Sequence, residues 1–146
     1  MLVAVLSLLL AGPAVAGPRH VVRCGPGEGE AAYRQLHRED LSWKALHRVH
    51  RTHGGCDDGY VAEAFGDAIG AVLEKRWREL EGRAGKLLTD RGFRELLLRH
   101  VDAYLSPQQL EAIQRNARER CPAGHAAFCA EVDRRAAVAL LEWAKG

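Results

Sequence analysis

The densest group of side chains able to bind a metal lies between residues 47 and 58. It contains, in order, His47, His50, His53, Cys56, Asp57 and Asp58. Imidazole and carboxylate groups are zinc ligands, and His47 and His50 would share a helix face. A spacing of three drifts by about 60° per step on an α-helix, however, so His53 diverges from His47. We expect a solvated basic helix end, no bound metal and no cofactor; the alternative is a periplasmic metal-binding protein that uses His47, His50 and His53.

Paired carboxylates form a second group that could do chemistry. Glu63 and Asp67 are four residues apart and share a helix face, shortly after Asp57 and Asp58. General acid and base catalysis would require a cleft and environments that separate the two pKa values. Helix capping by Asp57 or Asp58, and ion pairing by Glu63 and Asp67, explain these residues without catalysis.

Nucleophilic catalysis has no motif to support it. After residue 16 the only serines are Ser42 and Ser106, and Ser106 begins a Ser-Pro-Gln-Gln sequence that is typical of a capping box. The sequence contains no G-x-S-x-G, no H-E-x-x-H, no glycine-rich phosphate loop and no C-x-x-C-H haem motif. We therefore predict that the protein is not an enzyme.

Apolar residues recur every three or four positions along most of the chain, which predicts an all-α protein. The periodicity and the capping residues predict helical segments at 31–53, 59–80, 89–104, 106–121 and 125–144. In one reading, the Glu39-Asp40 pair divides the first segment into two shorter helices. The segment 59–80 carries the clearest apolar stripe and should be the central helix. The prediction is a small helical bundle of four to five helices.

The first sixteen residues resemble an export signal. An apolar run from Leu2 to Leu10 precedes Ala14-Val15-Ala16, a small-residue pattern typical of a cleavage site. We expect a signal peptide at 1–16, followed by a single domain at 17–146 that is periplasmic or secreted. The apolar run is far shorter than the roughly 20 residues that span a bilayer, so we do not expect a membrane-spanning protein.

The charge balance argues against a nucleic-acid-binding protein. The chain has 21 Lys and Arg against 19 Asp and Glu, a formal net charge of +2, and seven histidines. Basic and acidic residues alternate along the predicted helices, whereas a nucleic-acid interface concentrates cations on one face. Solvated helix faces with local ion pairs are the simpler explanation.

Four cysteines in an exported chain predict disulfides. Three pairings are formally open. Sequence proximity favours Cys121 with Cys129, across a short turn that contains Pro122 and Gly124, and hence Cys24 with Cys56.

A longer pattern resembles a known family. It runs from Cys56 through Gly59-Tyr60-Val61 and Asp67 at the head of the central helix, to Phe93 and Tyr104, and on to a helix that ends in Cys121-Pro122. This order is similar to that of the periplasmic immunity proteins that neutralise type VI secretion amidase effectors, which are small, helical, exported and disulfide-bearing.

The resemblance implies a protein partner, namely a peptidoglycan-cleaving enzyme whose cleft the protein would block. An inhibitor needs only a rigid surface with a few anchoring side chains and complementary charge. We expect Asp57, Asp58, Tyr60 and Glu63 to lie exposed at the start of the central helix and to contact the partner. An exported structural or accessory protein is the remaining alternative.

Overall fold

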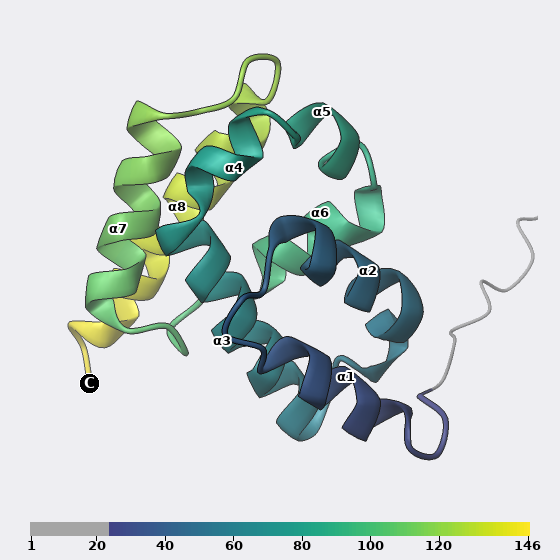
Figure 1. Ribbon diagram of the computed structural model, residues 1–146. Helices are drawn as coiled ribbons and strands as arrows, with labels where there is room; N and C mark the ends of the chain where they lie inside the picture. Colours follow the sequence, from purple (N-terminus) through teal and green to yellow (C-terminus); the bar gives the residue numbers. More distant parts are fainter. Residues whose placement is uncertain (1–23) are drawn as a thin grey trace, which may run out of the picture.

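Helices account for all the regular structure in the computed structural model, which describes residues 24–146 (Figure 1). The elements are α1 (Glu28–Leu36), α2 (Trp43–His53), the 3-10 turn η1 (Gly54–Cys56), α3 (Gly59–Lys75), α4 (Trp77–Glu81), α5 (Ala84–Leu87), α6 (Arg91–Arg99), α7 (Pro107–Glu119) and α8 (Ala126–Trp143). The all-α prediction is confirmed, with more and shorter helices than expected. The expected signal peptide at 1–16 lies outside the described residues.

Helix α3 lies at the centre of the fold, as its apolar stripe predicted. Its inward positions are Val61, Ala64, Phe65, Ala68, Ile69, Val72 and Leu73, all buried. Helix α1 packs on one side of α3 and α7 on another. The buried apolar residues of the described chain form one cluster, and no polar or charged residue of that part is buried in it.

The predicted helix 59–80 is interrupted at Arg76, where the backbone leaves helical geometry (φ −118°, ψ 19°). The interruption serves tertiary contacts. The carbonyl of Arg76 accepts a hydrogen bond from Nε1 of buried Trp43 at 2.8 Å, and the Arg76 guanidinium donates to the carbonyls of Asp40 and Leu41. A single helix through this point would direct these groups elsewhere.

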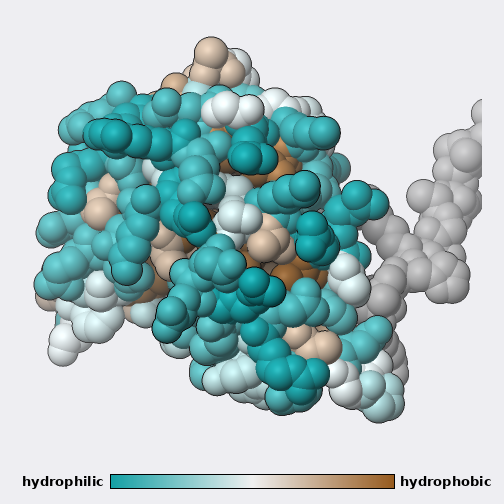
Figure 2. Space-filling model, in the orientation of Figure 1, coloured by the Kyte–Doolittle hydropathy of each residue, from teal (hydrophilic) through white to brown (hydrophobic). Residues whose placement is uncertain are grey.

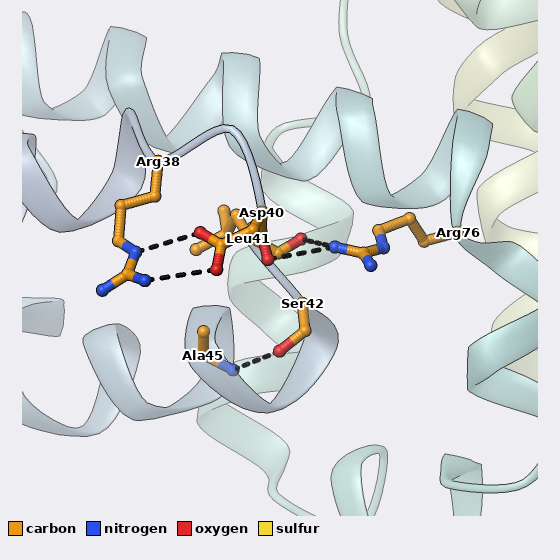
Figure 3. A network of polar contacts seen from close by, with 6 residues as sticks. All are labelled: Arg38, Asp40, Leu41, Ser42, Ala45 and Arg76. Carbon is orange, nitrogen blue, oxygen red and sulfur yellow. Dashed lines mark hydrogen bonds and ion pairs between the residues drawn. The ribbon is translucent and has the colours of Figure 1, made fainter.

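The Glu39-Asp40 pair does divide the first predicted segment, into α1 and α2. Figure 3 shows how the connection between them is held. Arg38 donates two hydrogen bonds to the Asp40 carboxylate, and Ser42 caps α2 by accepting from the backbone N–H of Ala45. Together with Arg76, these contacts fix the connection against the end of α3.

The predicted segment 89–104 is shorter than expected. Asp90 caps α6, accepting a hydrogen bond from the Phe93 N–H, but the helix ends at Arg99. Tyr104, the last residue of the predicted segment, therefore lies in the following turn and is exposed. Residues 84–87, expected to be irregular, form the short helix α5.

The last two helices form an antiparallel pair at the left of Figure 1. The predicted capping box is present: Ser106 accepts from the Gln109 N–H, and the Gln109 side chain accepts from the Ser106 N–H. A disulfide between Cys121 and Cys129 closes the connection from α7 to α8.

The second disulfide joins Cys24 to Cys56 and so ties the chain just before α1 to the turn before α3. The favoured pairing is therefore the one observed, and no free cysteine remains in the described chain. Two disulfides indicate an oxidising, extracytoplasmic environment. Among residues 24–146, no helix combines the length and the apolar character needed to cross a bilayer.

Candidate protein-binding surface

The outer face of α3 carries a tyrosine and two carboxylates. Tyr60, Glu63 and Asp67 are spaced by three and four residues and are all exposed, while Phe65 and Ile69 on the opposite side are buried. Residues at this spacing lie side by side along a helix. The sequence predicted the exposure of Tyr60 and Glu63, and the structure places both on this face.

Tyrosines from two other segments flank this face. The ring of Tyr33 on α1 lies 5.5 Å from that of Tyr60, centroid to centroid. On the other side, Tyr104 covers Gly66, where an added Cβ would lie only 3.2 Å from Cδ1 of the ring. Partial desolvation and, after it, the carboxylates of Asp67 and Glu63 raise the pKa of Tyr104 above its usual value. We call Tyr33, Tyr60, Glu63, Asp67 and Tyr104 the tyrosine face.

The distribution of aromatic residues distinguishes this face from the rest of the molecule. The sequence has three tyrosines, and Tyr33, Tyr60 and Tyr104 are 36%, 52% and 53% exposed. Most of the other large aromatic residues fill the core, namely Trp43, Phe65, Trp77, Phe93 and Phe128. Exposed apolar side chains scattered singly are ordinary, whereas the three tyrosines all lie around one face of α3. Trp143 on α8 is the other exposed large aromatic residue of the described chain.

A groove adjoins the tyrosine face. It has a volume of about 470 Å³ and lies between the α1–α2 connection and α3. Asp67 lines it and belongs to both surfaces, while His37, on the opposite wall, packs at a tilt against Tyr33 with 4.0 Å between ring centroids. The contacts of Arg38 and Arg76 in Figure 3 hold the wall that faces α3. The face and the groove therefore form one continuous, well-supported surface.

Asp57 does not belong to this surface, and the expectation that it is exposed is wrong. Its side chain is only 8% exposed and accepts hydrogen bonds from Arg99 and from Nε2 of His100, the latter at 2.9 Å. Burial alone would raise the pKa of Asp57, but the bonds from His100 and Arg99 outweigh it and hold the pKa below its usual range. Asp57 thus joins the turn after Cys56 to the end of α6.

Asp58 is exposed, as expected, and acts as the N-cap of α3. Its carboxylate accepts a hydrogen bond from the N–H of Gly59 at 2.8 Å. Gly59 has a positive φ of 52°, which a residue without Cβ adopts easily. Asp58 therefore has a structural role that is sufficient to explain it.

No two of the three histidines of the 47–58 segment share a hydrogen-bond partner in the described chain. Nε2 of His47 lies 2.8 Å from the Asp90 carboxylate, and Nε2 of His53 lies 3.3 Å from the Gln35 amide. The ring of His50 lies tilted against Phe93 and stacks on His47, with 6.5 Å between the two imidazole centroids, and burial lowers the pKa of His50. The alternative of a metal site shared by His47, His50 and His53 is not supported by this arrangement.

Within residues 24–146, one group of His, Cys or carboxylate side chains comes close enough to share a cation. It consists of Cys24, Glu28 and Cys56. Both sulfurs are joined in a disulfide, and Glu28 accepts a hydrogen bond from the Gly25 N–H. A disulfide sulfur is not a thiolate ligand, so this group has no metal-binding capacity in the oxidised protein.

Comparison with known proteins adds no further constraint. No protein-family model, no curated protein and no solved structure matches the chain.

Replacing Asp57 with asparagine is expected to lower the free energy of unfolding by about 2 kcal/mol at pH 7. The amide cannot pair with the Arg99 charge and accepts fewer bonds. The folded-state pKa of Asp57 is depressed, so its contribution is present above the usual aspartate pKa of about 4 and is lost as the pH falls through the folded-state value.

Urea unfolding of the wild type and the variant from pH 7 to pH 2 measures this effect. The stability difference should shrink towards acid pH. The control is Asp67→Asn, an exposed carboxylate on α3, which should change stability by less than about 0.5 kcal/mol. A difference between wild type and Asp57→Asn that does not depend on pH would contradict the assignment.

Proposed function

We propose that this protein is an exported helical protein-binding module and that the tyrosine face contacts its partner. The observation that carries the proposal is the placement of all three tyrosines, exposed, around the outer face of α3. Tyrosine is enriched among the residues that dominate binding energy at protein interfaces, because it offers a large contact area with few rotatable bonds.

The support beneath this face favours binding to a partner without rearrangement. Tyr60 and Glu63 lie on α3, whose opposite face is buried in the core, and Tyr33 is held beside Tyr60 by the packing of α1 on α3. The disulfide from Cys24 to Cys56 ties down the start of α1. A rigid surface loses little conformational entropy on association.

We further propose that the protein acts in the periplasm or outside the cell. The two disulfides support an oxidising compartment, and the apolar run with its Ala14-Val15-Ala16 motif supports export. A cell-wall-degrading enzyme works in this compartment. The resemblance to immunity proteins of type VI amidase effectors supports such an enzyme as the partner, with this protein as its inhibitor.

The chemistry of the face supports a partner with basic residues at its contact surface. Glu63 and Asp67 stand between Tyr60 and Tyr104 and take part in no ion pair within residues 24–146. Lysine or arginine of a partner could pair with these carboxylates and lie against the tyrosine rings. Such complementarity favours rapid and specific association.

Affinity capture from an envelope extract of the source organism tests the proposal. The bait is the oxidised protein, compared with a Tyr60→Ala, Tyr104→Ala double variant and with a Glu111→Ala, Arg115→Ala control on the exposed side of α7. We expect the double variant to retain at least about tenfold less partner than the wild type, because two interface anchors are removed. The control should retain as much partner as the wild type.

The captured partner is then assayed for peptidoglycan cleavage with and without the wild-type protein. Inhibition that the double variant fails to produce supports the inhibitor function. A specific partner that is retained equally by the double variant would exclude the tyrosine face as the binding surface. A partner without hydrolase activity would exclude the inhibitor function and leave the binding module.

A further inference from the structure

A groove with only basic charged residues on its walls lies between α2 and the turn that joins α4 to α5. It has a volume of about 400 Å³, and its lining residues are Lys44, His47, Arg51, Gly82, Arg83, Lys86 and Leu87. A second hollow of about 380 Å³ shares Lys44, His47 and Arg51 with it and adds Arg48 and Thr52. No acidic residue lines either one. We call the two together the cationic groove.

The basic residues of the cationic groove come from two facing walls. Lys44, Arg48 and Arg51 follow one another at spacings of four and three and so share one face of α2. Arg83 and Lys86 belong to the opposite wall, at the start of α5. Figure 1 shows α2 and α5 on the same side of the molecule.

These five cations have no acidic partner among residues 24–146. Elsewhere in the described chain, ion pairs are the usual arrangement for arginine. The arginines with a carboxylate within 4 Å are Arg34, Arg38, Arg76, Arg91, Arg99, Arg118, Arg134 and Arg135. Five cations that have no carboxylate within 4 Å in the described chain therefore gather in the cationic groove.

Two nearby carboxylates are already engaged: Asp90 lies beside His47, and Asp40 lines a neighbouring hollow with Lys44 and Arg48. Asp90 accepts hydrogen bonds from His47 and from the Phe93 N–H, and Asp40 is held by Arg38. Neither lines the cationic groove. Like charges spaced four residues apart destabilise a helix slightly, as Lys44 and Arg48 do on α2. An anion bound in the groove would remove this repulsion.

We propose that the cationic groove binds a ligand carrying at least two phosphate groups. Each phosphate brings up to about two negative charges and three acceptor oxygens, and guanidinium groups match this geometry with paired donors. A volume of about 400 Å³ is in the range of small-molecule sites and accommodates more than a single phosphate. Charges on both walls suit a ligand that spans the groove.

The binding of two probes tests the proposal and separates free from membrane-bound sources of the phosphates. One probe is inorganic pyrophosphate, titrated into the oxidised full chain by calorimetry. The other is phosphatidylcholine vesicles with and without cardiolipin, whose headgroup carries two phosphates, in a sedimentation assay. Both are run at physiological ionic strength, where interactions between distant charges are screened.

The test variant is Arg51→Gln with Lys86→Gln, which removes one cation from each wall. The matched control is Arg94→Gln with Arg115→Gln, two exposed cations outside the groove that remove the same total charge. Circular dichroism and thermal unfolding verify that both variants fold. We expect the groove variant to weaken binding by at least about tenfold and the control by less than about twofold.

Loss of pyrophosphate binding in the groove variant alone supports a free phosphate ligand. Loss of cardiolipin-dependent sedimentation alone, with no pyrophosphate binding, supports a lipid headgroup. Equal losses in the two variants would reduce the effect to net charge and overturn the proposal. Absence of binding to both probes would overturn the proposal as well. Binding of polyglutamate in place of both phosphate probes would also overturn it, because the groove would then be a site for acidic protein segments.

Discussion

Replacement of Trp77 by alanine is expected to lower the free energy of unfolding by about 4 kcal/mol, the largest effect we predict for a single substitution. Trp77 begins α4 directly after the interruption at Arg76, and its side chain is fully buried. Its Nε1 donates a hydrogen bond of 2.7 Å to the carbonyl of Arg120 at the end of α7. The substitution removes a large apolar volume and leaves that carbonyl without its donor.

Guanidinium chloride unfolding measures this loss, and Trp143→Ala is the matched control. Trp143 also donates through Nε1 to a carbonyl, that of Leu105, at 2.9 Å, but its side chain is 47% exposed. The control should therefore lose only about 1 to 2 kcal/mol. Equal losses at the two tryptophans would contradict the assignment of Trp77 to the core between α4 and α7.

Removal of the Cys24–Cys56 disulfide by double serine substitution is expected to lower the free energy of unfolding by about 3.5 kcal/mol. The bond closes a sequence separation of 32 residues that includes the whole of α1 and α2. In the chain-entropy account, its loss enlarges the conformational freedom of the unfolded chain. Because the bond also ties the start of α1 to the turn before α3, Tyr33 should lose its fixed place beside Tyr60.

The Cys121–Cys129 disulfide provides the comparison. It closes a separation of only eight residues, so its removal should cost about 2.5 kcal/mol. Denaturant unfolding of both double variants gives the two values. A larger loss from removal of the shorter bridge would show that loop closure does not dominate the stabilisation.

The helical class was predictable because local signals and burial agree in this chain. The apolar stripe of α3 predicted the core helix, and the Ser106 and Gln109 capping box predicted the start of α7. Both features depend on residues within one or two helical turns. Sequence periodicity and capping chemistry report such local features directly.

Helix ends set by tertiary contacts were not predictable in this way. The interruption at Arg76 depends on Trp43 and on the carbonyls of the α1–α2 connection, which are distant in sequence. The burial of Asp57 depends similarly on Arg99 and His100, and nothing near Asp57 in the sequence indicates them. Contacts of this kind override local preference.

The candidate surface was half predictable. Tyr60 and Glu63 follow from their place on the polar side of α3, whereas Tyr33 and Tyr104 join them through the packing of α1 and of the turn after α6. The face of the molecule in Figure 2 is largely hydrophilic, with apolar residues mostly in recesses. No local sequence signal indicates that Tyr33 and Tyr104 lie near Tyr60, because their placement depends on contacts between segments that are distant in the sequence.

Site-specific photo-crosslinking in the source organism tests the central claim most directly. A benzoylphenylalanine replaces Tyr60 in one variant and Tyr104 in another, and replaces Glu111 on α7 in a control. We predict that both tyrosine positions crosslink to the same protein and that position 111 does not. Crosslinking of a partner from position 111 with none from positions 60 and 104 would contradict the assignment of the tyrosine face as the binding surface.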